Sequence, residues 1–238
     1  MTDRPILFSA PMVRAILEGR KTQTRRVIKP QPIVEGNGAW RWEGQNGGFV
    51  GSMGTHVDEG FPESAKYWVH IQHGDRLWVR EAWRSEALYD DLPPSTMGGE
   101  EPVRYEADGR HQTWGYPAIV KLGRYRHGMF MPRWASRITL EVTDVHVERL
   151  QDISEADAIV EGIECDTDGW RDYLMPSTQC CMSAVDSYRT LWNHINGPDA
   201  WQTNPWVGAY TFNPIFQNID NIEREPSPTF RPAEGSRV

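Results

Sequence analysis

The stretch GRKTQTRR, residues 19–26, holds three arginines, one lysine and two threonines, and no acid. It follows a run with helical spacing, and Gly19 can end that helix because glycine readily adopts a positive φ. Side chains and backbone N–H groups then converge at the end of an element, where lysine and arginine suit an anion or a polar base edge. A lysine near a threonine also has the groups for base-assisted nucleophilic attack. Composition alone favours the alternative, a solvated basic loop.

Length and composition predict a folded domain. The chain has 238 residues, of which 39% are hydrophobic and 11 are tryptophan, enough to form a core. The formal net charge of −8 disfavours sequence-independent duplex binding, which needs a broad basic surface. Basic residues nevertheless gather in residues 14–29 and 121–137. They indicate a local pocket for an anion or a nucleotide, unless each segment only neutralises acidic neighbours.

The odd number of cysteines favours free or buried thiols in a reducing compartment over a disulfide framework. Cys165, Cys180, Cys181 and His194 match no zinc-knuckle spacing, so neither a metal nor a cofactor is expected. No run is long and apolar enough to cross a membrane, and the first residues lack a signal-peptide core. We therefore expect a cytoplasmic protein with no membrane association and no obligate protein partner.

The first third of the chain predicts a strand, a helix and an insertion. Residues 4–8 form a short apolar run, and Ser9 can cap the helix that ends at Gly19. Residues 31–73 are rich in glycine and tryptophan and predict an insertion whose aromatic rings either stack bases or, more in keeping with the pattern, cover a small core. The insertion is expected to contain a hairpin, with strands over residues 39–43 and 48–53.

Residues 76–83 alternate as a strand. Glu81 shares a face of it with apolar residues, and an acid in that position needs a partner, for which a structural role is slightly favoured over a functional one. A second insertion follows at residues 84–130. The basic and aromatic residues 125–134 are placed to cover a site.

Residues 135–150 alternate as a long strand, and a helix follows with Ser154 as its N-cap and Gly162 at its end. Glu161 then lies in the last turn, where a carboxylate opposes the negative end of the helix dipole at a cost of a few tenths to about 1 kcal/mol. A residue in a locally unfavourable position of this kind sometimes has a functional role. The alternative, an exposed glutamate whose cost is tolerated, is the interpretation that the sequence alone favours.

The last part of the chain predicts an irregular insertion at residues 163–183, a core-facing helix around 185–195, a strand over 206–212 and a poorly ordered tail at 217–238. The whole order of elements predicts an α+β fold, with a small, mostly antiparallel β-barrel and short helices at its rim. Residues 1–216 are expected to form one domain that carries the three insertions.

The pattern Gly19-x-Lys21-x-x-Thr24-x-Arg26 resembles the GxKxxExR signature of ASCH domains, with threonine in the glutamate position. The run MPRWASR at residues 131–137 is similar to that of the longer ASCH proteins of phages and prophages. The resemblance covers less than half of the chain and leaves the insertions unexplained. The matching blocks are residues 4–30, 74–83, 134–162 and 185–213.

The resemblance implies a PUA-like β-barrel that holds a nucleotide or RNA in a cleft. Compact bacterial members with threonine in the signature are N(4)-acetylcytidine amidohydrolases, and their working residues correspond to Lys21, Thr24 and Glu161. The sequence departs from those members directly after Glu161, where Gly162 follows. Contacts with the substrate are expected from Ser9, Arg26, Glu81, Trp83, Arg133 and Trp206.

The implied reaction removes an acyl group from a modified pyrimidine nucleoside. Lys21 would take a proton from Thr24 or from water, the oxygen would attack the acyl carbonyl, and Glu161 would give a proton to the leaving amine. The alternative is a module that binds RNA or a modified base without chemistry, and a weaker one is a ribonuclease. A modified pyrimidine nucleoside or RNA is the expected partner.

Overall fold

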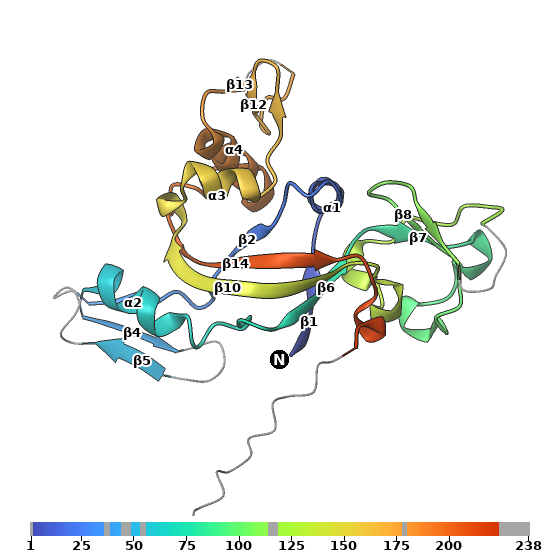
Figure 1. Ribbon diagram of the computed structural model, residues 1–238, viewed down its shortest axis with the longest axis horizontal. Coiled ribbons are helices and arrows are strands. Elements are labelled where there is room, and N and C mark those ends of the chain that lie inside the picture. The colour runs from blue at the N-terminus through green and yellow to red at the C-terminus, as the bar shows by residue number, and fades with distance from the viewer. Residues whose placement is uncertain are drawn as a thin grey trace, which may run out of the picture.

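A five-stranded sheet forms the centre of the molecule (Figure 1). The computed structural model describes residues 2–35, 39–43, 49–52, 56–113, 119–177 and 180–223, with the backbone alone described for 49–52. In spatial order the strands are β1 (Asp3–Leu7), β6 (Arg76–Arg80), β10 (Thr139–Arg149), β14 (Trp206–Ile215) and β2 (Gln23–Val27). β1 pairs with β6 in parallel, and the other neighbours pair antiparallel. The predicted α+β fold with mostly antiparallel sheets is confirmed.

The described strands do not close into a barrel. β1 and β2 stand at the two edges of the sheet, and the described residues form no backbone ladder between them. A side chain links these edges instead, because Arg26 Nη2 on β2 donates to the Leu7 carbonyl on β1 at 3.0 Å. Helix α1 (Ala10–Leu17) runs between the edge strands in the chain and packs Val13 and Ile16 into the sheet core.

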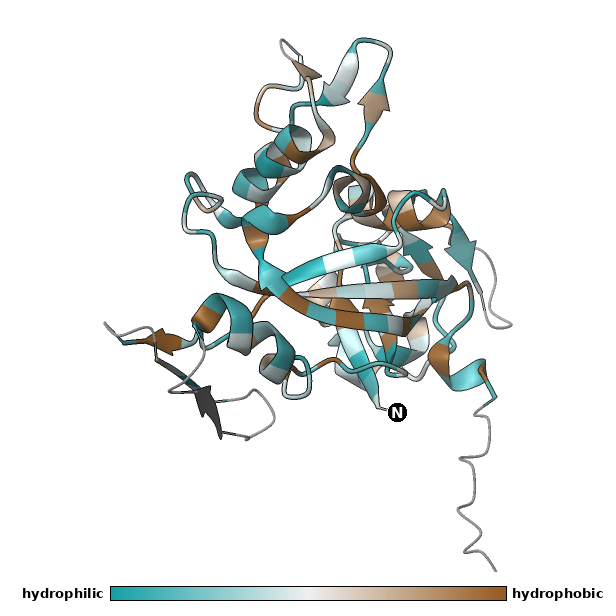
Figure 2. Ribbon diagram, turned by 60° about the vertical axis from the view of Figure 1, so that its left-hand side comes forward, coloured by the Kyte–Doolittle hydropathy of each residue, from teal (hydrophilic) through white to brown (hydrophobic). Residues whose placement is uncertain are grey.

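The long strands β10 and β14 carry the centre of the sheet. They pair from Thr139↔Ile215 to Arg149↔Trp206, with a register shift between Val142 and Asp144. Hydrophobic and hydrophilic residues are mixed along both strands (Figure 2). Buried side chains of the sheet, of α1 and of adjoining segments form the main core: Ile6, Phe8, Val13, Ile16, Leu77, Val79, Ala107, Ile138, Leu140, Val142 and Phe212.

Two helices cover the end of β10 and β14. α3 (Glu155–Val160) begins at Ser154, whose hydroxyl accepts from the Asp157 N–H as the predicted capping pattern requires. α4 (Ala184–Asn196) contacts α3, and a second core lies between them and the sheet. Its buried residues are Leu150, Ile153, Ala158, Ile163, Ala184, Tyr188, Trp192, Trp201 and Val207. Both helices were predicted within a residue or two of their observed bounds.

The first insertion contains β3 (Ile33–Val34), β4 (Trp40–Glu43), β5 (Phe49–Ser52) and α2 (Val57–Ala65). The β4–β5 hairpin confirms the predicted one, although residues 48 and 53 lie outside the described part of the chain. α2 was missed, because its Gly60 and Pro62 are typical helix breakers. Its Phe61 meets the rings of Trp40, Trp42 and Trp206 edge-on. Those tryptophans therefore belong to a core rather than to a base-stacking surface.

The second insertion pairs β7 (Trp83–Arg84), β8 (Val103–Tyr105) and β9 (His111–Gln112) around a core of its own. The strand predicted over 76–83 is consequently two strands with a break at Glu81. Gly128 packs against this break, and a Cβ there would stand 2.8 Å from Leu7 and 3.0 Å from the Glu81 backbone. Short 3₁₀ helices occupy Ala87–Tyr89, Pro94–Thr96, Gly128–Phe130, Arg133–Ala135, Leu150–Asp152 and Ile219–Asn221.

The third insertion was predicted to be irregular, and it instead contains the small sheet β11 (Cys165–Asp166), β12 (Gly169–Arg171) and β13 (Cys180–Cys181). These strands are too short for their alternation to show in the sequence. The three cysteines are free thiols, as expected, with Cys181 buried and the other two exposed. Figure 1 shows the three insertions projecting from the central sheet in different directions.

The poorly ordered tail was predicted to begin at residue 217, which is too early. Asn218 donates to the carbonyls of Arg133, Trp134 and Ser136 at 2.7–3.0 Å, and Ile219 is buried. Side-chain hydrogen bonding therefore holds this segment despite its polar composition. Residues 224–238 lie outside the described residues.

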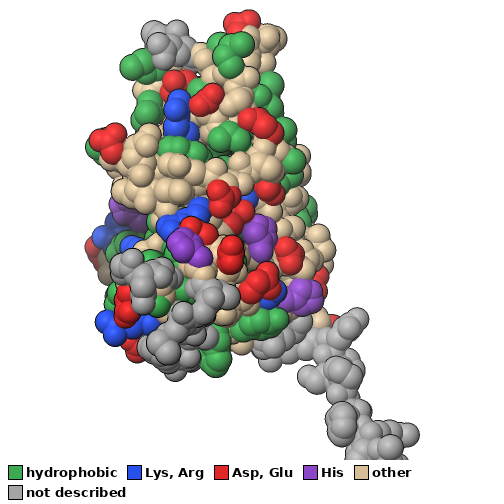
Figure 3. Space-filling view, turned by 90° about the vertical axis from the view of Figure 1, so that its left-hand side faces the viewer, with side chains coloured by type: hydrophobic (Ala, Val, Ile, Leu, Met, Phe, Trp, Pro, Cys, Tyr) green, Lys and Arg blue, Asp and Glu red, His purple; other side chains and the backbone are tan. Residues whose placement is uncertain are grey.

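The face on the α2 side of the molecule gathers acidic and histidine side chains (Figure 3). This agrees with the net charge of −8. Among the described residues, no helix is both long enough and apolar enough to span a bilayer.

Candidate functional site

Lys21 lies at the start of the signature stretch and is fully buried. Gly19 has a φ of 74° and ends α1, and the backbone N–H groups of Arg20 and Lys21 both donate to the Ala15 carbonyl. This turn directs the lysine inward. Its Nζ donates to the Gln23 carbonyl at 2.8 Å, to the Glu161 carbonyl at 2.8 Å and to Glu161 Oε2 at 2.7 Å. All three protons of the ammonium group are therefore used.

Glu161 is buried and ion-paired, so the interpretation as an exposed glutamate is wrong. It follows α3 directly as the C-cap residue, and its backbone bridges to that of Lys21. Besides Lys21, its carboxylate accepts from Arg25 Nη1 at 3.2 Å and from the Tyr188 hydroxyl at 3.4 Å. Two cations and a phenol thus supply the compensation for its unfavourable position at the end of a helix.

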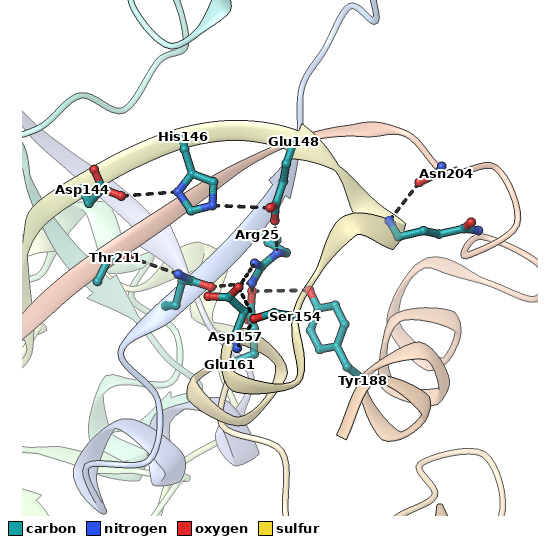
Figure 4. Close-up of polar contacts among 12 residues, drawn as sticks. Arg25, Asp144, His146, Glu148, Ser154, Asp157, Glu161, Tyr188, Asn204 and Thr211 are labelled. Atoms are coloured by element: carbon teal, nitrogen blue, oxygen red, sulfur yellow. Dashed lines mark hydrogen bonds and ion pairs between the residues drawn. The ribbon is translucent and has the colours of Figure 1, made fainter. Parts of the chain in front are cut away.

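Arg25 joins three elements beneath the site (Figure 4). Its Nε donates to Glu148 of β10 at 2.6 Å, and its Nη1 donates to the Gln23 side chain at 2.6 Å and to Glu161. Burial lowers the pKa of the guanidinium, but Glu161 and Glu148 outweigh this effect and raise it. Sequence reasoning treated Arg25 only as a nearby charge. Arg25 could have been identified as a site residue from strand alternation in β2, which places Gln23 and Arg25 on one face.

Thr24 points to the opposite face of β2 and is almost completely buried. Among the described residues its hydroxyl has no hydrogen-bond partner, so it is not bonded to Lys21. Tyr210 lies opposite Thr24 on β14, and burial raises the pKa of that phenol to about 12. The structure therefore brings Lys21 and Glu161 into contact, whereas Thr24, three residues after Lys21, keeps an unused hydroxyl.

A cavity of about 290 Å³ opens above Glu161 between β2 and α4. Arg26 lines it, donates to the Leu7 carbonyl and lies 5.2 Å above the Phe8 ring. Neither Lys21 nor Thr24 lines this cavity. The full lining is Met12, Arg25, Arg26, Val27, Lys29, Glu161, Tyr188, Leu191, Trp192, Ile195 and Asn196.

Electrostatics behind Glu161 favour loss of a proton from Lys21. Burial lowers the pKa of the Lys21 amine, and Arg26 and Arg25 lower it further. Glu161 acts in the opposite direction and does not cancel the effect. Burial also raises the pKa of the Tyr188 phenol, with the Glu161 charge acting in the same sense. Tyr188 was assigned to a core stripe by its helical spacing and was missed as a site residue.

Of the expected substrate contacts, Arg26 lines the first cavity and Ser9 lines a second one of about 490 Å³ beside it. Ser9 is the N-cap residue of α1, as predicted, but its side chain makes no capping bond. The two cavities share four residues: Met12, Glu161, Leu191 and Ile195.

Glu81 has a structural partner, the option that the sequence slightly favoured. Arg137 binds its two oxygens at 2.8 and 2.9 Å and also reaches Asp108 at 2.9 Å. Burial raises the pKa of Glu81, although Arg137 opposes that shift. Glu81 lines neither cavity at the signature stretch.

The other expected contacts also lie away from both cavities. Trp83 is fully buried in the core of the second insertion, under the Arg126 guanidinium. Trp206 packs on Phe61, under the Arg149 guanidinium. Arg133 pairs with Asp3 at 2.6 Å and with Asp220 at 2.7 Å. The basic and aromatic segment around Arg133 is therefore used in folding contacts and does not cover the Lys21 site.

No cluster of three or more histidine, cysteine, aspartate or glutamate side chains suited to a metal ion occurs within the described ranges. His146 comes nearest in composition, because Asp144 and Glu148 flank its ring nitrogens at 3.4 and 3.5 Å (Figure 4). Glu148 also forms an ion pair with Arg25. The group is thus part of the charge network under the site.

A scan against protein-family models, a search of curated proteins and a search of solved structures returned no match to this chain.

Proposed function

We propose that the protein is an amidohydrolase that removes an N(4)-acyl group from a modified cytidine or related pyrimidine nucleoside. The observation that carries this proposal is the buried Lys21–Glu161 pair, of which Glu161 lines an open cavity. Thr24, three residues after Lys21, adds an unused hydroxyl on the other face of β2. A buried lysine with a lowered pKa is the type of group that serves as a general base near neutral pH. The ASCH-like signature falls on the same residues.

A PUA-like barrel is the fold that we propose for the central sheet. The support is the approach of its two edge strands, which Arg26 and the Leu7 carbonyl bridge at 3.0 Å. Lys21 and Arg26 both lie over the Phe8 ring, which follows β1, at 5.6 and 5.2 Å. A strongly curved sheet whose seam is closed by side chains accounts for these contacts.

In the proposed reaction, neutral Lys21 removes the proton from the Thr24 hydroxyl, and the oxygen attacks the acyl carbonyl carbon. The proton passes along the 2.7 Å contact from Lys21 to Glu161 and then to the leaving exocyclic nitrogen as the C–N bond breaks. Water then releases the acyl group from Thr24. Arg26 is placed in the cavity to stabilise the oxyanion. A water molecule positioned by Thr24 is the alternative nucleophile.

Substrate binding must move Lys21, because its three protons are engaged elsewhere and it does not contact Thr24 in the free protein. Catalytic hydrogen bonds are often long or absent until the substrate is bound. The Phe8 ring, with its centroid 5.6 Å from the amine, offers a further contact to the amine as it changes partners.

The test follows the ultraviolet absorbance change as N(4)-acetylcytidine is converted to cytidine. Wild type should turn over this substrate or a longer N(4)-acylcytidine, and Lys21→Ala and Thr24→Val should each reduce kcat/KM by at least about 100-fold. Arg189→Ala is the matched control, because Arg189 is an exposed residue of α4 that lines neither cavity. Absence of turnover with every N(4)-acylcytidine would refute the amidohydrolase.

The second candidate is a module that binds a modified base or RNA without chemistry. The fully engaged Lys21 ammonium and the absence of Lys21 and Thr24 from the lining of the first cavity favour it. For such a module, N(4)-acetylcytidine or a short RNA should bind without being cleaved. Arg26→Gln should weaken that binding, whereas Arg189→Gln should not, and isothermal titration calorimetry measures both.

A further inference from the structure

The two cavities are adjacent and share Glu161 in their linings. Met12 of α1 and Leu191 and Ile195 of α4 line both of them, with Glu161 at the junction. The second cavity continues between α1 and α4 toward the third insertion, which supplies Glu164, Arg171, Tyr173 and Pro176 to its wall. Its volume of about 490 Å³ exceeds the 290 Å³ of the first. An acetyl group would leave most of it empty.

The second cavity offers mainly apolar surface. The charged groups at its border are already engaged, because Arg171 forms an ion pair with Glu164 and Arg14 donates to the Ala107 carbonyl at 3.0 Å. The apolar side chains that line it are Pro11, Met12, Tyr173, Pro176, Leu191 and Ile195. Such a wall suits a neutral, apolar group and gains free energy with each methylene that it covers.

The wall from the third insertion is held firmly against the helices. The Tyr173 backbone N–H donates to the Thr190 hydroxyl of α4 at 2.9 Å, and the Tyr173 phenol accepts from the Glu164 N–H at 3.0 Å. Ser187 of α4 donates to the Arg171 carbonyl at 2.6 Å. The insertion thus completes a preformed cavity wall.

The first cavity differs in the groups that it adds to an apolar lining. Arg26 and Asn196 offer hydrogen-bonding groups there, and Tyr188 and Trp192 offer aromatic faces. These are suited to a pyrimidine ring and its polar edge. With the base in the first cavity and the amide at Glu161, the acyl group points into the second.

We propose that the second cavity is an acyl-chain site and that the preferred substrate carries a neutral, straight acyl chain of several carbons. This inference rests on the proposed amidohydrolase function. It assigns to the third insertion the role of selecting the acyl group.

The experiment compares kcat/KM for cytidines that carry N(4)-acetyl, butanoyl, hexanoyl and octanoyl groups. In the wild type, kcat/KM should rise roughly threefold for each added methylene until the cavity is filled. His194→Trp narrows the cavity and Pro176→Asp places a charge in its wall, and both residues are exposed enough for the fold to tolerate the change. Each should reduce the octanoyl-to-acetyl ratio by at least about tenfold. The control Arg189→Trp, on the same helix and outside both cavities, should leave the ratio unchanged.

Binding measurements with uncleavable compounds test the acyl-chain site independently of the proposed amidohydrolase function. N(4)-octylcytidine and N(4)-methylcytidine have no amide to cleave, so calorimetry with them reports the cavity alone. Tighter binding of the octyl compound that Pro176→Asp abolishes would support the acyl-chain site, even if no substrate were turned over and the amidohydrolase failed. Equal affinity for the two compounds, or turnover that is independent of chain length, would overturn the acyl-chain site while leaving the amidohydrolase intact.

Discussion

Lys21 and Glu161 hold opposite charges out of water at 2.7 Å. Removing two charges from water costs several kcal/mol for each ion, and their attraction often does no more than offset that cost. Well-packed apolar residues of similar volume would serve stability about as well. Together with a cavity that reaches Glu161, this makes chemistry or ligand binding the better explanation for the pair.

Thr24→Val provides the sharpest test at the scale of one residue. The Thr24 hydroxyl is buried and, among the described residues, has no hydrogen-bond partner, so replacing it with a methyl group removes a desolvation cost. We expect the free energy of unfolding to rise by about 1 kcal/mol while turnover is lost. Urea unfolding and the absorbance assay measure the two effects. A variant that is both less stable and active would contradict the assigned role.

The pH dependence of activity should report Lys21. A general base must be neutral, so kcat/KM should rise with pH and level off above the Lys21 pKa, which burial places below the usual value of 10.5. Arg26 contributes to this lowering, and Arg26→Gln should therefore move the rising limb to higher pH. Arg189→Gln is the control and should leave the limb in place. A limb that stays fixed or moves to lower pH in Arg26→Gln would exclude Lys21 as the base.

At the scale of elements, the junction between α3 and the signature stretch decides the geometry of the site. Gly162 ends α3 with a φ of 89°, and a Cβ there would stand 2.8 Å from the Lys21 Cβ and 2.9 Å from the Ala15 Cβ. Only glycine allows α1, α3 and Lys21 to approach this closely. The residue that departs from the ASCH pattern therefore has a packing reason.

Gly162→Ala should destabilise the protein by about 2–5 kcal/mol, because backbone strain and overpacking add. It should also reduce kcat/KM, since Lys21 must shift. Gly19→Ala is the matched control, because Gly19 has a φ of 74° and a Cβ there would meet nothing within 4 Å, so that only the strain remains. Thermal unfolding of both variants measures the difference. Equal losses of stability would show that the contact with Lys21 is unimportant.

Local sequence patterns predicted many elements well. They failed where contacts between residues far apart in the sequence determine the structure. The cap at Ser154 and the end of α3 at Gly162 follow from neighbouring residues, and both were predicted. α2 was missed because burial of Phe61 among tryptophans overrides the helix-breaking Gly60 and Pro62. Propensity is a weak prior when tertiary packing acts against it.

At the scale of the whole molecule, residues 217–223, the last that the structure describes, contact the run at 131–137. Asn218 supplies a single amide to three carbonyls of that run. Arg133, expected to contact a substrate, instead pairs with Asp220 and Asp3 and so joins the two ends of the fold. The run at residues 131–137, which supports the likeness to phage ASCH proteins, therefore has a structural role.

Asn218→Ala should lower the free energy of unfolding by about 1–3 kcal/mol, because three partly buried carbonyls lose their donor. It should leave kcat/KM unchanged, since Asn218 lines neither cavity. Asn218→Asp should destabilise the protein more, because a carboxylate would face those carbonyls. Urea unfolding measures the stability of both variants. An unchanged urea midpoint in both would show that the Asn218 hydrogen bonds are not needed for stability.

The sequence by itself determined the elements whose signals are local: the strand before Ser9, the turn at Gly19, the capped helix after β10 and the position of Glu161 at the C-terminal end of that helix. It also pointed to Lys21 and Thr24 as site candidates through the signature pattern. These features depend on backbone preferences and near neighbours. Tertiary structure decided that Lys21 forms a direct ion pair with Glu161, 140 residues away, and that Arg25 and Tyr188 complete the site. It also decided that Glu81 pairs with Arg137 and that Trp83 and Trp206 belong to cores. The physical reason is that the partner of a buried charge or ring depends on strand order and helix packing, which bring together residues that no local pattern connects.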